Sequence, residues 1–193
     1  MAAPLILAST SPYRNALLAR LGLPFRTCRP EVDETPDPEE TPTALVLRLS
    51  GAKAAAAIRF FDDGLAIGSD QVAACEGRIL GKPGDRAHAV EQLRFLSGRS
   101  VEFLTGVCVH DLATNHVVAD LARTRVRFRT LPDAEIERYV DREPAFDCAG
   151  AFKSEGLGIT LVEAIEEDDP TAIIGLPLIR LCGLLRQFGI QLP

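Results

Sequence analysis

Histidine and tryptophan are scarce in this sequence. It has no tryptophan and only three histidines, His88, His110 and His116, which stand in unremarkable polar contexts. The motifs GxSxG, HExxH and GxGxxG are absent as well. These absences argue against a histidine-based catalytic triad and against a zinc site. We expect the three histidines to be surface residues.

Paired cysteines and long apolar runs are also missing. The five cysteines are odd in number, lie far apart and form no CxxC pair; they are Cys28, Cys75, Cys108, Cys148 and Cys182. We expect buried free thiols. The first ten residues lack the basic start of a signal peptide, and their apolar run is too short to cross a membrane. We therefore expect a reduced, cytoplasmic setting and no membrane attachment.

Lysine is rare. Of 21 basic residues only Lys53, Lys82 and Lys153 are lysines, and the other 18 are arginines. A retained lysine indicates either a position that needs a compact ammonium or no preference at all, and both interpretations stay open. The net charge of −6 argues against a surface that coats nucleic acid or anionic lipid. An anionic ligand must then be held by a few placed cations.

The apolar periodicity predicts one domain, 1–193, that mixes helices and strands. At 193 residues and 47% hydrophobic content, the chain can form a sizeable core. Strands are expected at 5–8, 25–29, 65–74, 78–80, 101–110, 117–128 and 158–163. Helices are expected at about 12–21, 42–60, 85–96, 132–140 and 176–188. A proline-rich acidic loop, 30–42, separates the second strand from the second helix. Such a pattern predicts an α/β or α+β fold on a mixed sheet.

The first candidate site lies where the first strand ends and the first helix begins. Ser9, Ser11 and Arg14 stand around the expected helix N-terminus, where free N–H groups favour an anion. Two hydroxyls and a guanidinium would complete a phosphate cradle. The alternative is ordinary helix capping by Ser11 with Arg14 in solvent.

Two further candidates carry carboxylates. Asp70 belongs to Gly-Ser-Asp-Gln at the expected end of an apolar strand, where it could bind a metal, activate water or merely cap a turn. Asp33 and Glu34 in the acidic loop could complete a site for a hard cation, or they could simply be solvated. Lys82 and Lys153 lie beside glycines, which makes them plausible phosphate contacts outside the P-loop pattern.

Taken in order, seven segments resemble the Maf family of nucleoside triphosphate pyrophosphatases: SxSPxR, PEVDE, KA, GSDQV, GKP, CAGAFKSEG and GLP. The match runs from Leu5 to about Leu185. The chain is most similar to the branch associated with 7-methyl-GTP hydrolysis. That branch is indicated by SPYR where the wider family usually has SPRR, by GSDQ in place of GADT, and by AFKSEG in place of AYGIQG.

The resemblance implies a fold and a reaction. The fold is α/β and Maf/ITPase-like, with a long mixed sheet and flanking helices that form two lobes around a cleft. The implied reaction cuts the α–β phosphoanhydride of a nucleoside triphosphate with a divalent cation, Mg²⁺ or Mn²⁺. By this resemblance Asp70 is catalytic, and Glu34 and Asp70 surround the metal. The residues implied to hold phosphates are Ser9, Ser11, Arg14, Lys53 and Lys82.

Base choice is implied to depend on Tyr13, Gln71 and Glu155. A 7-methylguanine ring is positively charged, so stacking on Tyr13 and pairing with Glu155 both gain from that charge. Tyr13 as a packing residue is the alternative. Two other functions remain open: hydrolysis of UTP, dTTP or modified pyrimidine nucleotides, and non-catalytic nucleotide binding by a regulator of cell division. The oligomeric state is open too, a homodimer included.

Overall fold

The computed structural model describes residues 3–192, and the chain divides into two compact units. Unit 1 comprises Met1–Asp70, Thr105–Ala122 and Asp169–Pro193, and unit 2 comprises Gln71–Leu104 and Arg123–Asp168. The expectation of a single domain stays a prediction, because a division by contacts does not say whether the units unfold together. Among residues 3–192, no helix is long and apolar enough to cross a membrane.

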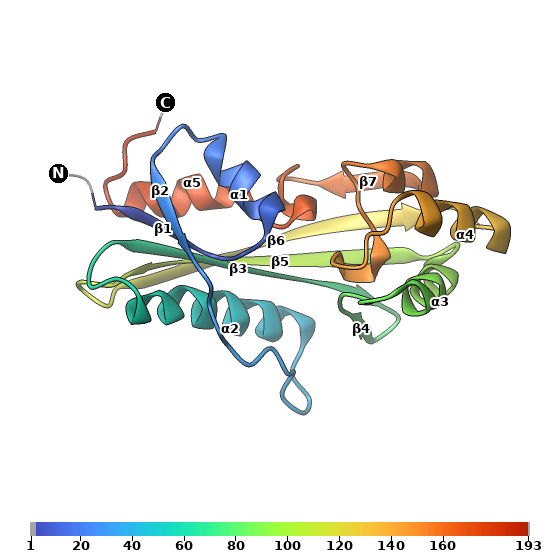
Figure 1. Cartoon of the computed structure of the whole chain (residues 1–193), viewed down its shortest axis with the longest axis horizontal. Coiled ribbons are helices and arrows are strands. Elements are labelled where there is room, and N and C mark those ends of the chain that lie inside the picture. The colour runs from blue at the N-terminus through green and yellow to red at the C-terminus, as the bar shows by residue number, and fades with distance from the viewer. Residues whose placement is uncertain (1–2, 193) are drawn as a thin grey trace. The chain divides into compact units, whose positions relative to one another are not determined.

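The elements follow the order expected from the periodicity (Figure 1). Those of unit 1 are β1 (Leu5–Ala8), α1 (Pro12–Ala19), β2 (Phe25–Cys28), α2 (Pro42–Ala55), the first part of β3 (Leu65–Cys75), the later part of β5 (Ser100–Asp111), the first part of β6 (Val117–Phe128) and α5 (Leu178–Gln187). Those of unit 2 are the remaining parts of β3, β5 and β6 with β4 (Arg78–Leu80), α3 (Arg86–Leu96), α4 (Asp133–Arg142) and β7 (Val162–Glu167). Short 3₁₀ turns at Ala56–Arg59, Ala149–Ala151, Leu157–Leu161 and Ala172–Ile174 complete the chain.

The strands form one mixed sheet in the order β2-β1-β3-β5-β6-β7, with β4 paired to β3. β1 is parallel to both β2 and β3, whereas β4 is antiparallel to β3 and β7 is antiparallel to β6. This confirms the expected α/β fold with a mixed sheet and flanking helices. In unit 1 the chain leaves β1 for β2 on one side and returns to β3 on the other. The carboxyl end of β1, which lies between β2 and β3, is thus a topological switch point, the kind of place where α/β proteins bind ligands.

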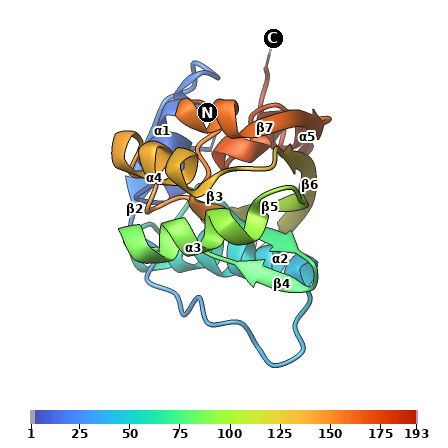
Figure 2. The same cartoon turned by 90° about the vertical axis from the view of Figure 1, so that its right-hand side faces the viewer.

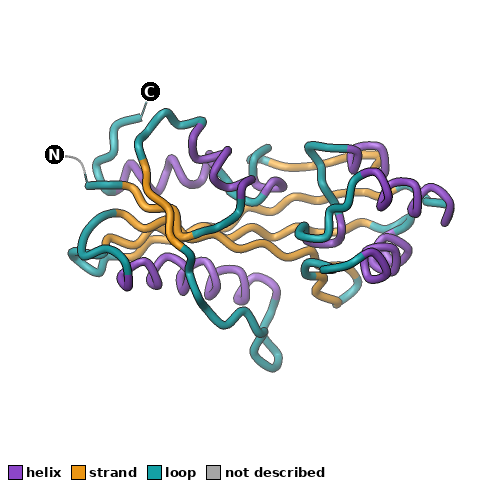
Figure 3. Tube along the Cα trace, viewed as in Figure 1, coloured by secondary structure: helices purple, strands orange, loops and turns teal. Residues whose placement is uncertain are grey.

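Both faces of the sheet in unit 1 are covered. Alternate residues of β1 point to opposite faces: Leu5 and Leu7 pack with α1 and α5, while Ile6 and Ala8 pack with Ala54 of α2. Figure 1 shows α1 and α5 on one side of the strands and α2 on the other. The connection from β2 to α2 is a long loop, drawn in teal in Figure 3, that leaves the sheet and returns to the start of α2.

Unit 2 has its own packed centre. Figure 2 shows α3 and α4 side by side, and the two helices are in contact. The ring of Phe152 packs against the rings of Phe103 and Phe128, with centroids 5.7 and 5.2 Å away. Phe152 is buried, so the backbone next to it is anchored in the core.

Three expectations need correction. The expected strand 158–163 is wrong in its first part: Leu157–Leu161 is a 3₁₀ turn and β7 begins at Val162, because the Gly158 N–H donates to the Lys153 carbonyl and curls the chain. His110 is buried rather than exposed, with Nε2 2.8 Å from the Asn115 side-chain oxygen. Gly-Ser-Asp-Gln lies inside β3 and not at its end.

The cysteines are all free thiols, as expected. Their burial is confirmed in part: Cys75 and Cys108 are buried, and Cys28, Cys148 and Cys182 are half-buried. Removal from water raises the pKa of the Cys108 thiol to about 11, so this sulfur stays protonated and packs as an apolar side chain.

Candidate active site

An ammonium between two carboxylates is the central feature of unit 1. Lys53 projects from α2, and its Nζ lies 2.7 Å from Asp70 Oδ1 on β3 and 2.6 Å from Glu34 Oε1 in the loop before α2. The side chains of Lys53 and Asp70 are only 7% and 10% exposed, while that of Glu34 is 54% exposed. Burying an unpaired charge is costly, and the two carboxylates offset that cost for the Lys53 ammonium.

Two glycines allow α2 to come close enough for this contact. A Cβ on Gly68 of β3 would lie 2.1 Å from the Ser50 carbonyl oxygen, and one on Gly106 of β5 would lie 2.6 Å from the Val46 carbonyl oxygen. Any larger residue would push the helix away from the strands. Since Lys53 is one turn further along α2 than Ser50, the glycines determine how far Lys53 reaches.

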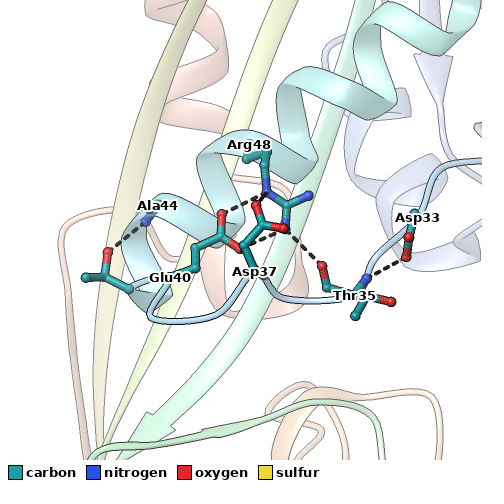
Figure 4. Close-up of polar contacts among 7 residues, drawn as sticks. Asp33, Thr35, Asp37, Glu40, Ala44 and Arg48 are labelled. Carbon is teal, nitrogen blue, oxygen red and sulfur yellow. Dashed lines mark hydrogen bonds and ion pairs between the residues drawn. The ribbon is translucent and has the colours of Figure 1, made fainter.

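The loop that carries Glu34 is tied to α2 by an arginine (Figure 4). Arg48 Nε and Nη2 donate to the two oxygens of Glu40 at 2.8 and 2.7 Å, and Nη2 also donates to the Thr35 carbonyl at 3.1 Å. Asp37 Oδ2 lies 3.6 Å from Arg48 Nε. The hydrogen bond from Arg48 lowers the pKa of Glu40, so this carboxylate stays ionised and the planar pairing is kept.

A second arginine holds the other side of Glu34. Arg59 Nη1 donates to the Glu31 carbonyl at 3.0 Å, and the Thr35 N–H donates to Asp33 Oδ1 at 2.9 Å. The hydrogen bonds to Thr35 lower the pKa of Asp33. Backbone carbonyls on both sides of Glu34 are therefore bound by arginines from α2 and the turn that follows it. The acidic loop is an ordered support for Glu34.

The junction between β1 and α1 behaves partly as ordinary capping. The Arg14 N–H is 3.4 Å from Ser11 Oγ, which makes Ser11 the N-cap, and the Ser11 N–H donates to Ser9 Oγ at 3.1 Å. Beside them is a hollow of about 440 Å³; its lining residues are Ser9, Thr10, Ser11, Pro12, Asn15, Thr27, Cys28 and Arg29. Hydroxyl groups thus line an open space at the amino end of a helix, as an anion site requires.

Arg14 is not solvated, contrary to the simple capping interpretation. Its Nε donates to the Gly175 carbonyl at 2.8 Å, and the residue as a whole is half-buried. Burial lowers the pKa of Arg14, while the charges of Asp70 and Glu34 act to raise it. An arginine remains protonated under such conditions. Arg14 and Lys53 thus bring two cations to the region of two carboxylates.

Asp169 was missed by the sequence analysis and organises the segment that holds Arg14. It is completely buried and accepts hydrogen bonds from the N–H groups of Ile179 and Arg180, at 2.8 and 3.2 Å. Its other oxygen accepts from the N–H and the hydroxyl of Thr171. The carboxylate therefore caps α5 and closes the turn that presents the Gly175 carbonyl. Asp-Pro-Thr shortly before a helix is the signal that could have indicated it.

In unit 2, Lys82 lies in an exposed loop that is tied to a second loop. The Gly81 carbonyl accepts from the Gly150 N–H at 3.2 Å, and the Gly84 N–H donates to the Phe146 carbonyl at 3.0 Å. The segment that leads to Glu155 is thereby adjacent to the Gly-Lys-Pro-Gly loop. Two motifs about 70 residues apart in the sequence are neighbours.

The structure thus brings together part of the expected set. In unit 1 it brings Glu34, Lys53 and Asp70 into contact and places Arg14 where the charges of both carboxylates act on it. Ser9, Ser11 and Tyr13 lie where β1 ends and α1 begins. Unit 2 holds Gln71, Lys82 and Glu155. Among residues 3–192 there is no group of three or more His, Cys, Asp or Glu side chains placed to hold a metal ion.

Arg48 was also overlooked, although a signal was present. Arg48 and Lys53 are the only charged residues in α2, whose other members are mostly apolar or small. A lone arginine on an apolar helix that follows an acidic loop indicates a partner in that loop.

The model of the Maf-like protein family matches residues 4–188. Proteins named 7-methyl-GTP pyrophosphatase are similar over almost the whole chain. The one from Polaromonas sp. (strain JS666) is 53% identical over 98% of this chain and 86% of its own length. Those from Albidiferax ferrireducens and Pseudoalteromonas translucida are 51% and 52% identical over 97% of this chain, and over 94% and 93% of their own lengths. On this match, the chain is a member of the Maf family.

Proposed function

We propose that this protein hydrolyses 7-methyl-GTP to 7-methyl-GMP and pyrophosphate. The observation that carries the proposal is the buried Lys53 held between Glu34 and Asp70. The relatives named 7-methyl-GTP pyrophosphatase, at 51–53% identity over nearly the full chain, support the substrate. A triphosphate needs positive charge and precise positioning for hydrolysis, and Lys53 and Arg14 would supply part of that charge.

The carboxylate pair fits a divalent cation. Mg²⁺ is bound in proteins through one or two carboxylates together with substrate phosphates and water. Glu34 Oε1 and Asp70 Oδ1 both lie within 2.7 Å of the Lys53 ammonium, so the two carboxylates are close neighbours. These two residues would hold Mg²⁺ or Mn²⁺. Such an ion would supply charge neutralisation for the phosphates and would make the attacking water easier to deprotonate.

The residues of the chain have separate roles in the proposed reaction. Asp70 accepts the proton of the attacking water through Oδ2, while Lys53 holds Oδ1. The water oxygen forms a bond to the α-phosphorus, the bond from that phosphorus to the bridging oxygen breaks, and pyrophosphate leaves. Lys53 and Arg14 offset the growing negative charge. Ser9, Ser11 and Lys82 complete the proposed phosphate contacts.

The proposed base contacts involve an aromatic ring, a carboxylate and an amide. Tyr13 would stack on the cationic ring of 7-methylguanine, and Glu155 would accept hydrogen bonds from its edge. Gln71, which follows Asp70 directly in β3, would donate to or accept from the base. A neutral guanine offers the same edge without the positive charge. The proposed contacts therefore predict a preference for the methylated base.

The test is pyrophosphate release from a panel of nucleotides, with and without Mg²⁺ or Mn²⁺. The panel contains 7-methyl-GTP, GTP, UTP and dTTP, and kcat/KM is measured for each. We expect metal-dependent release with 7-methyl-GTP as the best substrate. A higher kcat/KM for UTP or dTTP would show that 7-methyl-GTP is not the preferred substrate, while hydrolysis to pyrophosphate would still stand. Nucleotide binding without pyrophosphate release would instead support a regulator.

A further inference from the structure

The segment that carries Glu155 is held by α4 of unit 2. Glu143, which directly follows α4, lies with Oε1 2.9 Å from Lys153 Nζ and with Oε2 2.9 Å from the Leu157 N–H. Both partners are in the segment 153–157, one two residues before Glu155 and one two residues after it. The hydrogen bond from Lys153 lowers the pKa of Glu143, so the carboxylate stays ionised and binds both ends of the segment.

Tyr139 provides a second attachment from the same helix. Its hydroxyl donates to the Ala151 carbonyl at 3.1 Å and accepts from the Lys153 N–H at 3.2 Å. Burial raises the pKa of Tyr139, so the hydroxyl keeps the proton that it donates. Phe152, between these two contacts, is fixed in the core of unit 2.

The glycines of the motif are required by this arrangement. A Cβ on Gly156 would lie 2.1 Å from Glu143 Oε2, and a Cβ on Gly158 would lie 2.4 Å from the Lys153 carbonyl oxygen. Both glycines lie in close contact with the groups that bind the segment. Lys-Ser-Glu-Gly-Leu-Gly therefore folds around the Glu143 carboxylate.

Glu155 itself is exposed, and its Oε2 is 3.4 Å from the Ser154 hydroxyl, a long hydrogen bond. The direction of the Glu155 side chain depends on the chain to either side of it, and Glu143 binds that chain at Lys153 and Leu157. We propose that Glu143 and Lys153 are positioning residues for base specificity, which hold Glu155 toward the 7-methylguanine ring. This rests on the proposed function. Lys153 on this view contacts no phosphate.

The experiment measures the ratio of kcat/KM for 7-methyl-GTP to that for GTP in Lys153→Met. This variant keeps the bond from Leu157 to Glu143 and removes only the lysine from the pair. We expect the ratio to fall about three- to tenfold, because a displaced Glu155 loses a base contact while phosphate binding is unchanged. Glu143→Gln, which keeps an acceptor for the Leu157 N–H, should reduce the ratio in the same direction.

A double-mutant cycle separates positioning from a general structural effect. In the Glu155→Gln background, Lys153→Met should cause no further fall in the ratio, because the residue that it positions no longer carries the charge. Additive falls in the ratio would overturn the proposal, since Lys153 would then act on the base independently of Glu155.

The matched control is Asp141→Asn, a change in α4 two residues before Glu143. Asp141 pairs with Arg86 at 2.8 Å on the exposed side, so its loss should change the ratio by less than about twofold. A ratio that falls equally in Asp141→Asn and Lys153→Met would overturn the proposal.

A readout without substrate distinguishes the failure of this inference from that of the proposed function. Hydrogen exchange at the Leu157 amide should be faster in Glu143→Ala than in wild type, and unchanged in Asp141→Asn. If wild type prefers 7-methyl-GTP but Lys153→Met keeps the ratio, the positioning role is wrong and the function stands. If wild type shows no such preference, the proposed substrate is wrong. Unchanged exchange of the Leu157 amide in Glu143→Ala would overturn the claim that Glu143 holds the segment 153–157.

Discussion

The loop that carries Glu34 in unit 1 and the segment that carries Glu155 in unit 2 are held in opposite ways. In unit 1 the Glu34 carboxylate is bound directly, because Lys53 Nζ lies 2.6 Å from Glu34 Oε1. In unit 2, Glu143 binds Lys153 and the Leu157 N–H on either side of Glu155, while the Glu155 carboxylate is exposed. The carboxylate proposed to bind a metal is held by an ion pair, whereas the carboxylate proposed to contact the base is exposed and is held mainly through the chain around it.

The three lysines also differ in their surroundings. Lys53 is buried between two carboxylates, Lys153 is half-buried and paired with Glu143, and Lys82 is exposed in a glycine loop. The retained lysines therefore have three distinct environments. Only Lys53 stands where a compact ammonium, smaller than a guanidinium, is needed to reach two carboxylates at once.

The largest effect is expected at the directly held site. Asp70→Asn should lower kcat at least about a hundredfold, because the amide cannot accept a proton and binds a metal poorly. It also removes a charge partner of the buried Lys53, so the melting temperature is measured alongside pyrophosphate release. Asp141→Asn, an exposed carboxylate in unit 2, is the control and should keep wild-type kcat. Near-normal activity of folded Asp70→Asn would remove Asp70 from the mechanism.

A change that leaves every charged residue in place should disturb the same site. Gly68→Ala would place a Cβ against the Ser50 carbonyl, push α2 from β3 and destabilise the fold by about 1–3 kcal/mol. We expect activity to fall as Lys53 moves from Asp70. Gly51→Ala is the matched control within α2: a Cβ there meets nothing within 4 Å, so stability should rise by about 0.5–1 kcal/mol. Denaturant unfolding and kcat for both variants would show whether the close approach matters.

The indirect support of Glu34 should matter less. Arg48→Met breaks the contacts to Glu40 and to the Thr35 carbonyl but leaves the Lys53 contacts with Glu34 and Asp70. We expect kcat/KM to fall about tenfold, with a higher Mg²⁺ concentration needed for half-maximal activity. Arg48→Lys should not restore kcat/KM, since an ammonium cannot make the two parallel hydrogen bonds to Glu40. If Arg48→Met has an unchanged Mg²⁺ requirement, the arginine does not act through Glu34.

Lys82→Arg tests the exposed lysine. Arginine is larger than the ammonium that it replaces, and in the short Gly-Lys-Pro-Gly loop it would displace bound phosphates, which predicts a several-fold rise in KM. Because Lys82 is exposed, the melting temperature should stay the same. A variant with wild-type KM would show that either cation serves at this position.

Only the choice of base, and not the rate of hydrolysis in general, is expected to depend on the exposed Glu155 carboxylate. Glu155→Gln should reduce the ratio of kcat/KM for 7-methyl-GTP to that for GTP about tenfold, because only the methylated base carries the charge that the carboxylate meets. Tyr13→Leu should reduce the same ratio by loss of the aromatic face. An unchanged ratio in both variants would place Tyr13 and Glu155 among packing and loop residues.

The sequence by itself determined the order of helices and strands and the residues worth testing. The periodicity located β1, β3 and α3 closely because local apolar patterns dictate such elements. It misplaced β7, since Gly158 curls the chain through a contact with Lys153 that no local pattern reveals. The role of each site residue remains a prediction, although the proximity of Glu34, Lys53 and Asp70 is now a structural fact.

Only the tertiary structure decided which residues hold those groups in place. Lys53 meets Asp70 across 17 positions, Ser69 meets the Gly175 carbonyl across 106, and Arg14 meets the same carbonyl across 161. Arg48, Asp169 and Glu143 act through contacts of this kind or through loops whose path the sequence does not state. The physical reason is that a hydrogen bond depends on distance in space, and the packing of helices on the sheet determines that distance.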